Sequence, residues 1–244
     1  MVSICLKTST MRTFLRNILA LKNKEVILTV SSNTLSNVCL DPQHICMVRQ
    51  TVEIQVNGPD EGPVSFGVDV PLMLSVLSLV KDNADLILAN GSNNEVYISA
   101  NSVSATLAPV DTSAIEDPKI PDFGRTVLVR ADVDAGAVLS VLRSIPKMNR
   151  RPMCDNVTVC NIGSNLFFHY SVNGSKISTH IPSESKGSRR HVRSIFSVDY
   201  LTDIFSRMHG TVSVGMSNNW PMTVSWQYAE SATARFYLAP HIEE

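Results

Sequence analysis

Phe66-Gly-Val-Asp69 opens an apolar run that continues to Val80, and Phe196-Ser-Val-Asp199 opens a second such run that continues to Met208. The second copy begins 130 residues after the first, and each copy is followed by a short run that is rich in β-branched residues. Recurrence of a pattern at a fixed offset indicates repeated structural units. We therefore predict that the chain consists of two copies of one module.

Four segments have the residue spacing of short amphipathic helices. In the first, Met11, Phe14, Leu15, Ile18 and Leu19 follow the positions i, i+3, i+4, i+7 and i+8, which places them on one face of a helix. The predicted helices, two in each copy, cover residues 10–21, 71–80, 134–145 and 200–208.

Local signals also predict where these helices begin and end. Ser9 or Thr10 can cap the first helix, and Pro71 suits the first turn of the second helix. Asp134 is expected to open the third helix, and Gly210 follows the end of the fourth.

Most of the remaining sequence is rich in β-branched and apolar residues, with Asn-Gly turn signals at 57–58, 90–91 and 173–174. The segment 109–121 shows neither the 3.6-residue repeat of an amphipathic helix nor the two-residue alternation of a strand. Its three prolines favour an extended linker. The predicted strands are 26–30, 45–56, 85–89, 96–107, 157–162, 166–172, 176–181, 211–214, 222–226 and 234–238.

These patterns predict an α+β fold with two similar domains, each a sheet backed by two helices. The expected N-terminal domain covers residues 1–108, the connector covers 109–122 and the C-terminal domain covers 123–244.

The composition is that of a folded protein. Of the 244 residues, 44% are hydrophobic and 18% are charged, so disorder as the dominant state is excluded. The longest apolar run is far shorter than the roughly 20 residues of a membrane span. The first residues also lack the pattern of a secretory signal. We therefore expect an intracellular protein that is not secreted.

Charge is divided unevenly along the chain. Residues 1–122 hold 8 Lys/Arg against 13 Asp/Glu, a net charge of −5. Residues 123–244 hold 13 Lys/Arg against 9 Asp/Glu, a net charge of +4. Nucleic-acid binding then depends on whether the basic residues gather on one face.

Few features point to an enzyme. The chain has no GxxxxGK[ST], GxGxxG or HExxH motif, and its five cysteines show no CxxC spacing. Cys39, His44 and Cys46 lie close together but lack a plausible fourth zinc ligand nearby. Asp132 and Asp134 precede a predicted helix and are better explained as capping residues. We expect no catalytic residue, no metal site and no cofactor.

The C-terminal sequence Arg235-Phe-Tyr-Leu-Ala-Pro-His-Ile-Glu-Glu244 resembles the ending of the proliferating cell nuclear antigen family, the sliding DNA clamps of eukaryotes and archaea. Leu40-Asp-Pro-Gln-His-Ile45, Phe66-Gly-Val-Asp69, the Ile120-Pro121 pair of the connector and Trp220-Pro-Met222 match further family motifs in the same order. The resemblance spans the whole chain and agrees with the internal duplication.

This resemblance implies a trimeric ring of six similar domains that encircles duplex DNA. Such a ring tethers DNA polymerase and other replication and repair enzymes as a processivity factor. Helices would line the hole, and basic side chains on them would contact phosphates without reading the sequence. Ser75 and Ser78 stand where many clamps carry lysines, which predicts weaker DNA contact through the first domain. The predicted DNA-binding residues are Arg12, Arg16, Lys81, Arg143, Lys147, Arg150 and Arg207.

The resemblance also implies a pocket, between the connector and the C-terminal tail, that binds a short partner peptide through apolar and aromatic anchors. The clamp loader and other enzymes that carry such a peptide are the expected partners. Subunits would join through the edge strands at 103–107 and 176–181. The predicted peptide-binding residues are Leu40, His44, Ile45, Ile120, Pro221, Tyr237, Ala239, Pro240 and Ile242.

Two other functions stay open at this point. One is a specialised clamp paralogue, such as a subunit of a checkpoint-type heterotrimer or a viral processivity factor, which the near-neutral charge favours. The other is a protein-interaction scaffold that never encircles DNA. The expected compartment follows the organism: the nucleus in a eukaryote and the cytoplasm in an archaeon.

Overall fold

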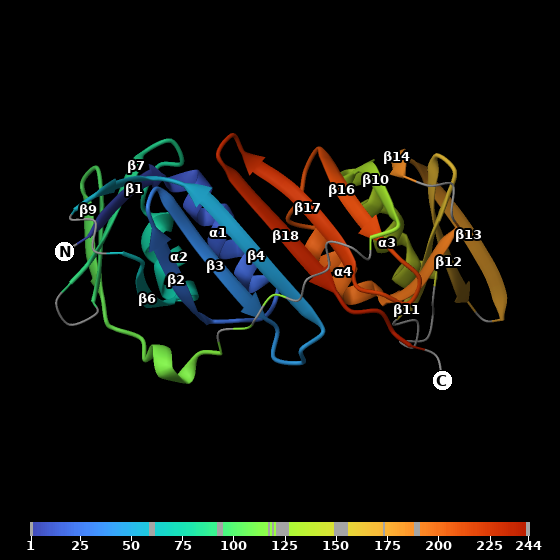
Figure 1. Cartoon of the computed structure of the whole chain (residues 1–244), viewed down its shortest axis with the longest axis horizontal. Coiled ribbons are helices and arrows are strands. Elements are labelled where there is room, and N and C mark those ends of the chain that lie inside the picture. The colour runs from blue at the N-terminus through green and yellow to red at the C-terminus, as the bar shows by residue number, and fades with distance from the viewer. Residues whose placement is uncertain are drawn as a thin grey trace. The chain divides into compact units, whose positions relative to one another are not determined.

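A computed structural model describes residues 2–58, 62–91, 95–116, 118, 120, 127–148, 156–172, 174–187 and 191–242. The chain forms two compact units (Figure 1). Unit 1 consists of Met1–Ile120 together with Gln227–Ala234. Unit 2 consists of Pro121–Trp226 together with Arg235–Glu244.

The N-terminal half of the chain supplies the helices and most of the strands of unit 1. Its strands pair in the orders β5-β1-β7-β8-β9 and β4-β3-β2-β6, with antiparallel neighbours. The elements are β1 (Ser3–Lys7), α1 (Thr8–Leu19), β2 (Glu25–Ser31), β3 (Thr34–Leu40), β4 (Cys46–Glu53), β5 (Gln55–Asn57), β6 (Val64–Asp69), α2 (Val70–Ser78), β7 (Asp85–Asn90), β8 (Val96–Ala100) and β9 (Val103–Leu107).

The C-terminal half repeats this order of strands and helices. Its strands pair in the orders β14-β10-β16-β17-β18 and β13-β12-β11-β15, so each strand occupies the place of the strand numbered nine lower. The elements are β10 (Val129–Asp134), α3 (Ala135–Met148), β11 (Asn156–Ile162), β12 (Asn165–Val172), β13 (Ser175–Pro182), β14 (Glu184–Gly187), β15 (Val192–Ser197), α4 (Val198–Phe205), β16 (Thr211–Met216), β17 (Met222–Ala229) and β18 (Ala232–Leu238). The predicted α+β fold with two helices in each copy is confirmed.

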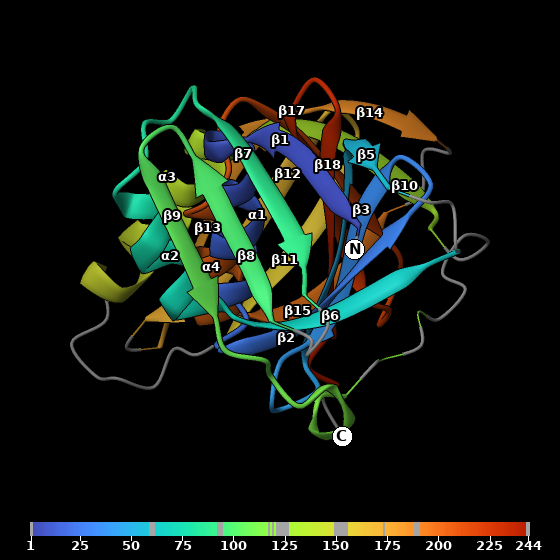
Figure 2. The same cartoon turned by 90° about the vertical axis from the view of Figure 1, so that its left-hand side faces the viewer.

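The apolar stripe of α1 is buried in unit 1. Met11, Phe14, Leu15 and Ile18 are each 0% exposed, and the helix packs against α2, β1 and β4. Figure 2 shows α1 and α2 behind the sheet that contains β7, β8 and β9. Burying a side chain of this size contributes roughly 1.5–3 kcal/mol. Because these residues recur with helical spacing, their burial fixes which face of α1 meets solvent.

The prediction that Ser9 or Thr10 caps α1 is wrong. The helix begins at Thr8, directly after β1, and Lys7 at its N-cap makes no side-chain cap. The first free N–H groups instead donate to a neighbouring turn: Thr8 N–H to the carbonyl oxygen of Ala84 at 3.0 Å and Ser9 N–H to that of Asp82 at 2.9 Å. These contacts satisfy donors that a capping side chain would otherwise bind.

Two aspartates do cap helices. Asp69 accepts a hydrogen bond from the N–H of Leu72 at 2.7 Å at the start of α2. Asp134 accepts one from the N–H of Ala137 at 2.7 Å at the start of α3, as the sequence predicts. A cap of this kind typically stabilises a helix by about 1 kcal/mol.

A small polar network lies in the core of unit 1. Asn17 on α1 and Gln50 on β4 are both 0% exposed, and the Asn17 amide donates to Gln50 Oε1 at 2.8 Å. The Gln50 amide in turn donates to the carbonyl oxygen of Phe14 at 3.0 Å and to Asn37 Oδ1 at 3.3 Å. Buried polar groups must find such partners, so the network specifies the position of α1 against β3 and β4.

Two predicted long strands are each divided in the structure. The 45–56 strand is divided at Ile54 into β4 and β5, and the 96–107 strand is divided at a turn where Asn101 has a φ of 50°. The prediction also missed several strands, most of which contain Gly, Asn, Asp, Glu or Lys residues, the types that are depleted in strands. These strands are β1, β3, β6, β10, β14 and β15.

The tip of the β17–β18 hairpin completes unit 1. The N–H of Glu53 donates to the carbonyl oxygen of Ser231 at 2.9 Å, and the Thr51 and Thr233 hydroxyl groups lie 2.9 Å apart. Residues close to the end of the sequence therefore extend a sheet that β4 belongs to.

Within the described part of the chain, no helix combines the length and apolarity needed to cross a bilayer.

Candidate functional site

The predicted basic surface contains four exposed cations. Arg16 on α1 and Arg143 on α3 are exposed, as are Lys81 after α2 and Arg207 after α4. None of the four forms an ion pair in the part of the chain that the structure describes. Each can therefore offer its charge to a phosphate group.

The exposed face of α3 is shallowly hollowed beside Arg143. Gly136, Leu139, Ser140 and Ser144 line a depression of about 370 Å³ together with this arginine. The small residues Gly136, Ser140 and Ser144 let a phosphate backbone approach the helix closely. The Arg143 guanidinium can then bind a phosphate group there.

The side chains of two further predicted DNA-binding residues are outside the described part of the structure. Lys147 belongs to α3, but its side chain is outside the described residues, and Arg150 is outside them altogether.

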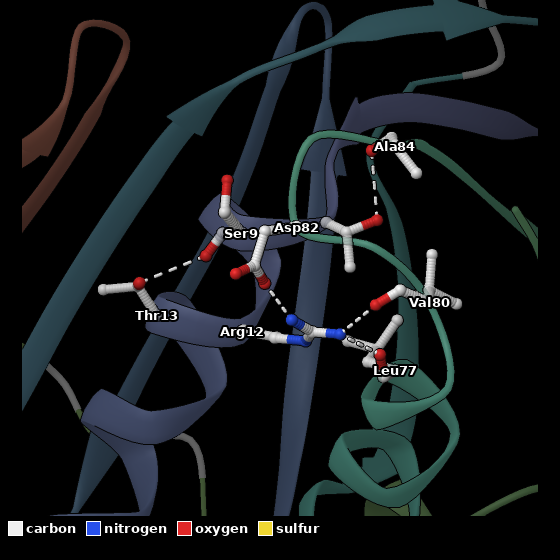
Figure 3. A network of polar contacts seen from close by, with 8 residues as sticks. Ser9, Arg12, Thr13, Leu77, Val80, Asp82 and Ala84 are labelled. Atoms are coloured by element: carbon white, nitrogen blue, oxygen red, sulfur yellow. Dashed lines mark hydrogen bonds and ion pairs between the residues drawn. The ribbon is translucent and has the colours of Figure 1, made fainter.

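Arg12 is occupied within unit 1. Figure 3 shows its guanidinium reaching from α1 to the C-terminal end of α2, where it binds the Asp82 carboxylate and the carbonyl oxygens of Leu77 and Val80. Its side chain is only 14% exposed. A helix end leaves carbonyl groups without intrahelical partners, and a guanidinium can satisfy two of them at once. Arg12 therefore connects the two helices, and little of its charge is left for DNA.

The outer face of α2 carries no charge. Leu72 and Leu79 are 47% and 73% exposed, and Ser75 and Ser78 are exposed between them. The Ser75 hydroxyl donates to the carbonyl oxygen of Pro71 at 3.0 Å and the Ser78 hydroxyl to that of Ser75 at 2.6 Å. These hydroxyl groups already bind the helix backbone, so α2 offers a duplex little beyond Lys81.

A tight loop between β3 and β4 presents the first group of predicted peptide-binding residues. The Asp41 carboxylate, in a residue only 2% exposed, accepts hydrogen bonds from the N–H groups of Gln43 at 3.1 Å and of Ile45 and Cys46 at 2.6 Å each. His44 takes a φ of 59° at the tip, a conformation that is uncommon outside glycine. Asp41 therefore holds the loop in a shape that leaves His44 exposed, with Leu40 and Ile45 half-buried beside it.

The connector approaches this loop within unit 1. Val110 lies so close to Gly67 on β6 that a Cβ added at Gly67 would come within 2.9 Å of the Val110 side chain. Further along, the Glu116 carboxylate lies 3.6 Å from His44 Nε2. Ile120, four residues later, is half-buried. The structure thus brings Glu116 of the connector to the loop that carries His44.

A short turn supports the connector between these two points. The Ser113 hydroxyl and backbone N–H donate to Asp111 at 2.7 and 2.9 Å, and these bonds lower the pKa of the Asp111 carboxyl group. The 3₁₀ turn Thr112–Ala114 follows from this cap.

The other predicted peptide-binding residues belong to unit 2. Pro221, Ala239 and Pro240 are half-buried and Ile242 is 66% exposed, so all four can be reached. Tyr237 is only 7% exposed and packs as a core residue. The tail is held by a hydrogen bond from the N–H of His241 to the carbonyl oxygen of Ile195 at 2.8 Å.

Cys39, which lies near His44 in the sequence, is poorly suited to nucleophilic chemistry. Burial raises the pKa of the Cys39 thiol to about 12, so it stays protonated near neutral pH. Among the described residues, no group of three His, Cys, Asp or Glu is placed to hold a metal ion.

Known proteins resemble this chain in sequence and in fold along its length, although no protein-family model matches it. A DNA polymerase sliding clamp from Methanothrix thermoacetophila is 23% identical over 239 residues, which cover 90% of each chain. The structure titled as the C-terminal region of FEN-1 bound to A. fulgidus PCNA superposes with a TM-score of 0.86, at 21% identity and over 100% of both chains. The chain has the sliding-clamp fold.

The PCNA2–PCNA3 complex from Sulfolobus tokodaii has this sliding-clamp fold too, with a TM-score of 0.82, 16% identity and coverage of 100% of both chains. The resemblance expected from the C-terminal motif is thereby confirmed. No local sequence signal could have found the role of Arg12, because its partners lie in a turn some 70 residues further along the chain.

Replacing Arg12 with glutamine should destabilise the sliding-clamp fold. Arg12→Gln leaves the carbonyl groups at the end of α2 without their charged donor, and we expect a loss of roughly 1–3 kcal/mol in the free energy of unfolding. Urea denaturation followed by circular dichroism measures it.

Arg16→Gln is the matched control on the same helix, with an expected change within about 0.5 kcal/mol. Equal stability of the two variants would show that the Arg12 contacts contribute nothing.

Proposed function

We propose that this chain is a DNA sliding clamp, which encircles duplex DNA and tethers DNA polymerase and other replication and repair enzymes to it. Two observations together carry the proposal: the sequence agrees over 88–90% of the chain with proteins named DNA polymerase sliding clamp, and the fold agrees over the full chain with that of a PCNA. The protein would work by enclosure and docking rather than by catalysis, in the compartment that holds the DNA.

The duplex would be contacted through the exposed cations of the helix faces. Arg16, Arg143 and Arg207 are exposed and unpaired among the described residues, as such contacts require. The affinity of such binding comes from counterion release, so it falls as the salt concentration rises, and it does not depend on the DNA sequence. Arg12 would contribute indirectly, by holding α1 against α2.

Retention on DNA should depend on its topology. Protein assembled on nicked circular duplex is expected to stay bound at a salt concentration that releases simple electrostatic ligands, and to dissociate once a restriction enzyme linearises the circle. Gel filtration of the DNA before and after cutting measures this. Equal retention on circular and linear DNA would contradict the clamp and favour a scaffold that does not encircle DNA.

The salt dependence of binding to short duplexes should show the contribution of each arginine. Each of three variants is expected to make the negative slope of log K against log salt less steep by about 0.9. These variants are Arg16→Gln, Arg143→Gln and Arg207→Gln. Arg49→Gln, at an exposed position on β4, is the control and should leave the slope unchanged.

Assembly would use two unpaired strand edges. β9 and β13 each end the strand order of their sheet, so each has one edge without a partner there. Exposed edges of this kind readily pair with another chain. We propose that β9 of one copy pairs with β13 of the next, which closes a ring of three copies.

Light scattering behind size exclusion should give a mass near three times 26.7 kDa over a range of protein concentrations. A monomer or dimer at every concentration would contradict the homotrimer. It would favour the second candidate, a clamp paralogue that needs different partner subunits. The uncharged outer face of α2 supports that candidate, and a complex of two different clamps is known from Sulfolobus tokodaii.

Partner peptides would dock on the loop that Asp41 holds and on the connector beside it. Leu40 and Ile45 offer apolar surface, Glu116 brings the connector to His44, and Ile120 follows on the same segment. A relative of this fold has been solved with the C-terminal region of FEN-1 bound. Pro221, which precedes β17, and the accessible tail residues Ala239, Pro240 and Ile242 are proposed as further contacts for such peptides.

Ile120→Ala should weaken peptide binding about tenfold, because truncating an apolar anchor of a docked peptide typically costs more than 1 kcal/mol. Isothermal titration with a peptide from the C-terminal region of FEN-1 measures the affinity. Leu79→Ala, which removes an equally apolar and far more exposed side chain just after α2, should leave the affinity unchanged. Unchanged affinity for Ile120→Ala, with assembly intact, would remove the connector from the docking surface.

A further inference from the structure

The sheet β13-β12-β11-β15 of unit 2 has one apolar face and one polar face. Val157 and Val159 on β11 and Phe168 on β12 are each at most 1% exposed, and α3 packs against β12 and β13. The residues that alternate with them point to the opposite side, as strand geometry requires. On that side the surface is hollowed into a depression of about 650 Å³.

The depression is lined by basic and neutral side chains. Lys176 on β13, His169 on β12, Arg193 on β15 and His241 of the tail contribute to it, and no Asp or Glu does among the described residues. Neither Lys176 nor Arg193 forms an ion pair within the part of the chain that the structure describes. A positive surface without its own counter-charges suits an anionic ligand.

Aromatic rings lie on the same face: His169 lines the depression, Phe167 is stacked beside His169, and His180 lies next to Phe167. The rings of Phe167 and His169 lie parallel, with an angle of 4° between their planes and 6.0 Å between their centroids. His180 on β13 lies opposite Phe167 in the strand register, with its ring centroid 5.4 Å from that of Phe167. Flat rings that are partly open to solvent form a surface on which nucleobases can stack.

The cations stand on either side of these rings. Arg193 on β15 is level with Phe167, because Arg193 pairs with Cys160 and Cys160 pairs with Phe167. Lys176 on β13 pairs with Ser171, which lies four residues along β12 from Phe167. β13 and β15 are separated by β12 and β11, so the two basic side chains are roughly 14 Å or more apart across the sheet. A ligand that reaches both must be extended and carry several negative charges.

We propose that this face binds single-stranded nucleic acid. The phosphates would bind Lys176 and Arg193, and the bases would stack on the rings of Phe167, His169 and His180, the combination of chemistry that unpaired strands require. An acidic peptide could use the cations but would gain little from the rings. This site lies on the side of the sheet opposite α3, and it is therefore separate from the helix faces proposed to contact duplex DNA.

Fluorescence anisotropy with a labelled oligothymidine of about 15 nucleotides tests the proposal. The double variant Lys176→Gln/Arg193→Gln should bind at least tenfold more weakly, with the salt slope reduced by about 1.4, because each lost phosphate contact on a single strand contributes about 0.7. Phe167→Leu should also weaken binding about tenfold, but it should leave the salt slope unchanged. Arg49→Gln is the control for a lost surface charge and should bind like the unaltered protein.

Three results would overturn the proposal. The unaltered protein could fail to bind the oligonucleotide, the double variant could bind as tightly as the control, or poly-glutamate could bind equally well with no effect of Phe167→Leu. Circular dichroism and the assembled mass establish that each variant is folded. Retention on circular duplex is measured separately, so the loss of single-strand binding alone leaves the proposed clamp function intact.

Discussion

The burial of one face of each helix is the constraint on which the rest of this structure depends. Phe14 and Ile18 fix α1 against its sheets, as Val138 and Leu142 fix α3, and all four are at most 1% exposed. The outward positions of Arg16 and Arg143 follow from this burial rather than from any local electrostatic preference. Moving either arginine by one residue would rotate it by about 100° around the helix and direct it toward the packed side.

The two copies share one order of strands and helices but differ in the chemistry of their surfaces. In unit 1, α2 exposes leucines and serines, and Arg12, the first arginine of α1, is turned inward to satisfy carbonyl groups of that helix. In unit 2, Arg143 forms no ion pair with any described residue and lies beside a shallow hollow of α3. Core positions therefore constrain the sequence similarly in both copies, while solvent-facing positions are open to change, which explains why the repeat is visible mainly in its apolar residues.

Sequence reasoning located the features that depend on local spacing and missed those that depend on distant partners. Helical periodicity identified all four helices and Asp134 as a cap, because both signals lie within a few neighbouring residues. The roles of Arg12 and Tyr237 were not predictable in this way. Arg12 has a helix-surface position like that of Arg16, and only the turn after α2 makes it a structural residue. Tyr237 belongs to an apparent peptide-binding motif, yet its burial assigns it to the core.

The hydrogen bond between Glu53 and Ser231 has a consequence for biosynthesis. A ribosome makes the chain from its N-terminus, so the strand that contains Glu53 emerges long before the hairpin that pairs with it. Unit 1 cannot complete its hydrogen bonding until the β17–β18 hairpin has been translated. Until then the part of β4 that contacts the hairpin tip keeps an unpaired edge, with which a neighbouring nascent chain can pair. For the same reason, a fragment that ends at the connector would be an incomplete unit.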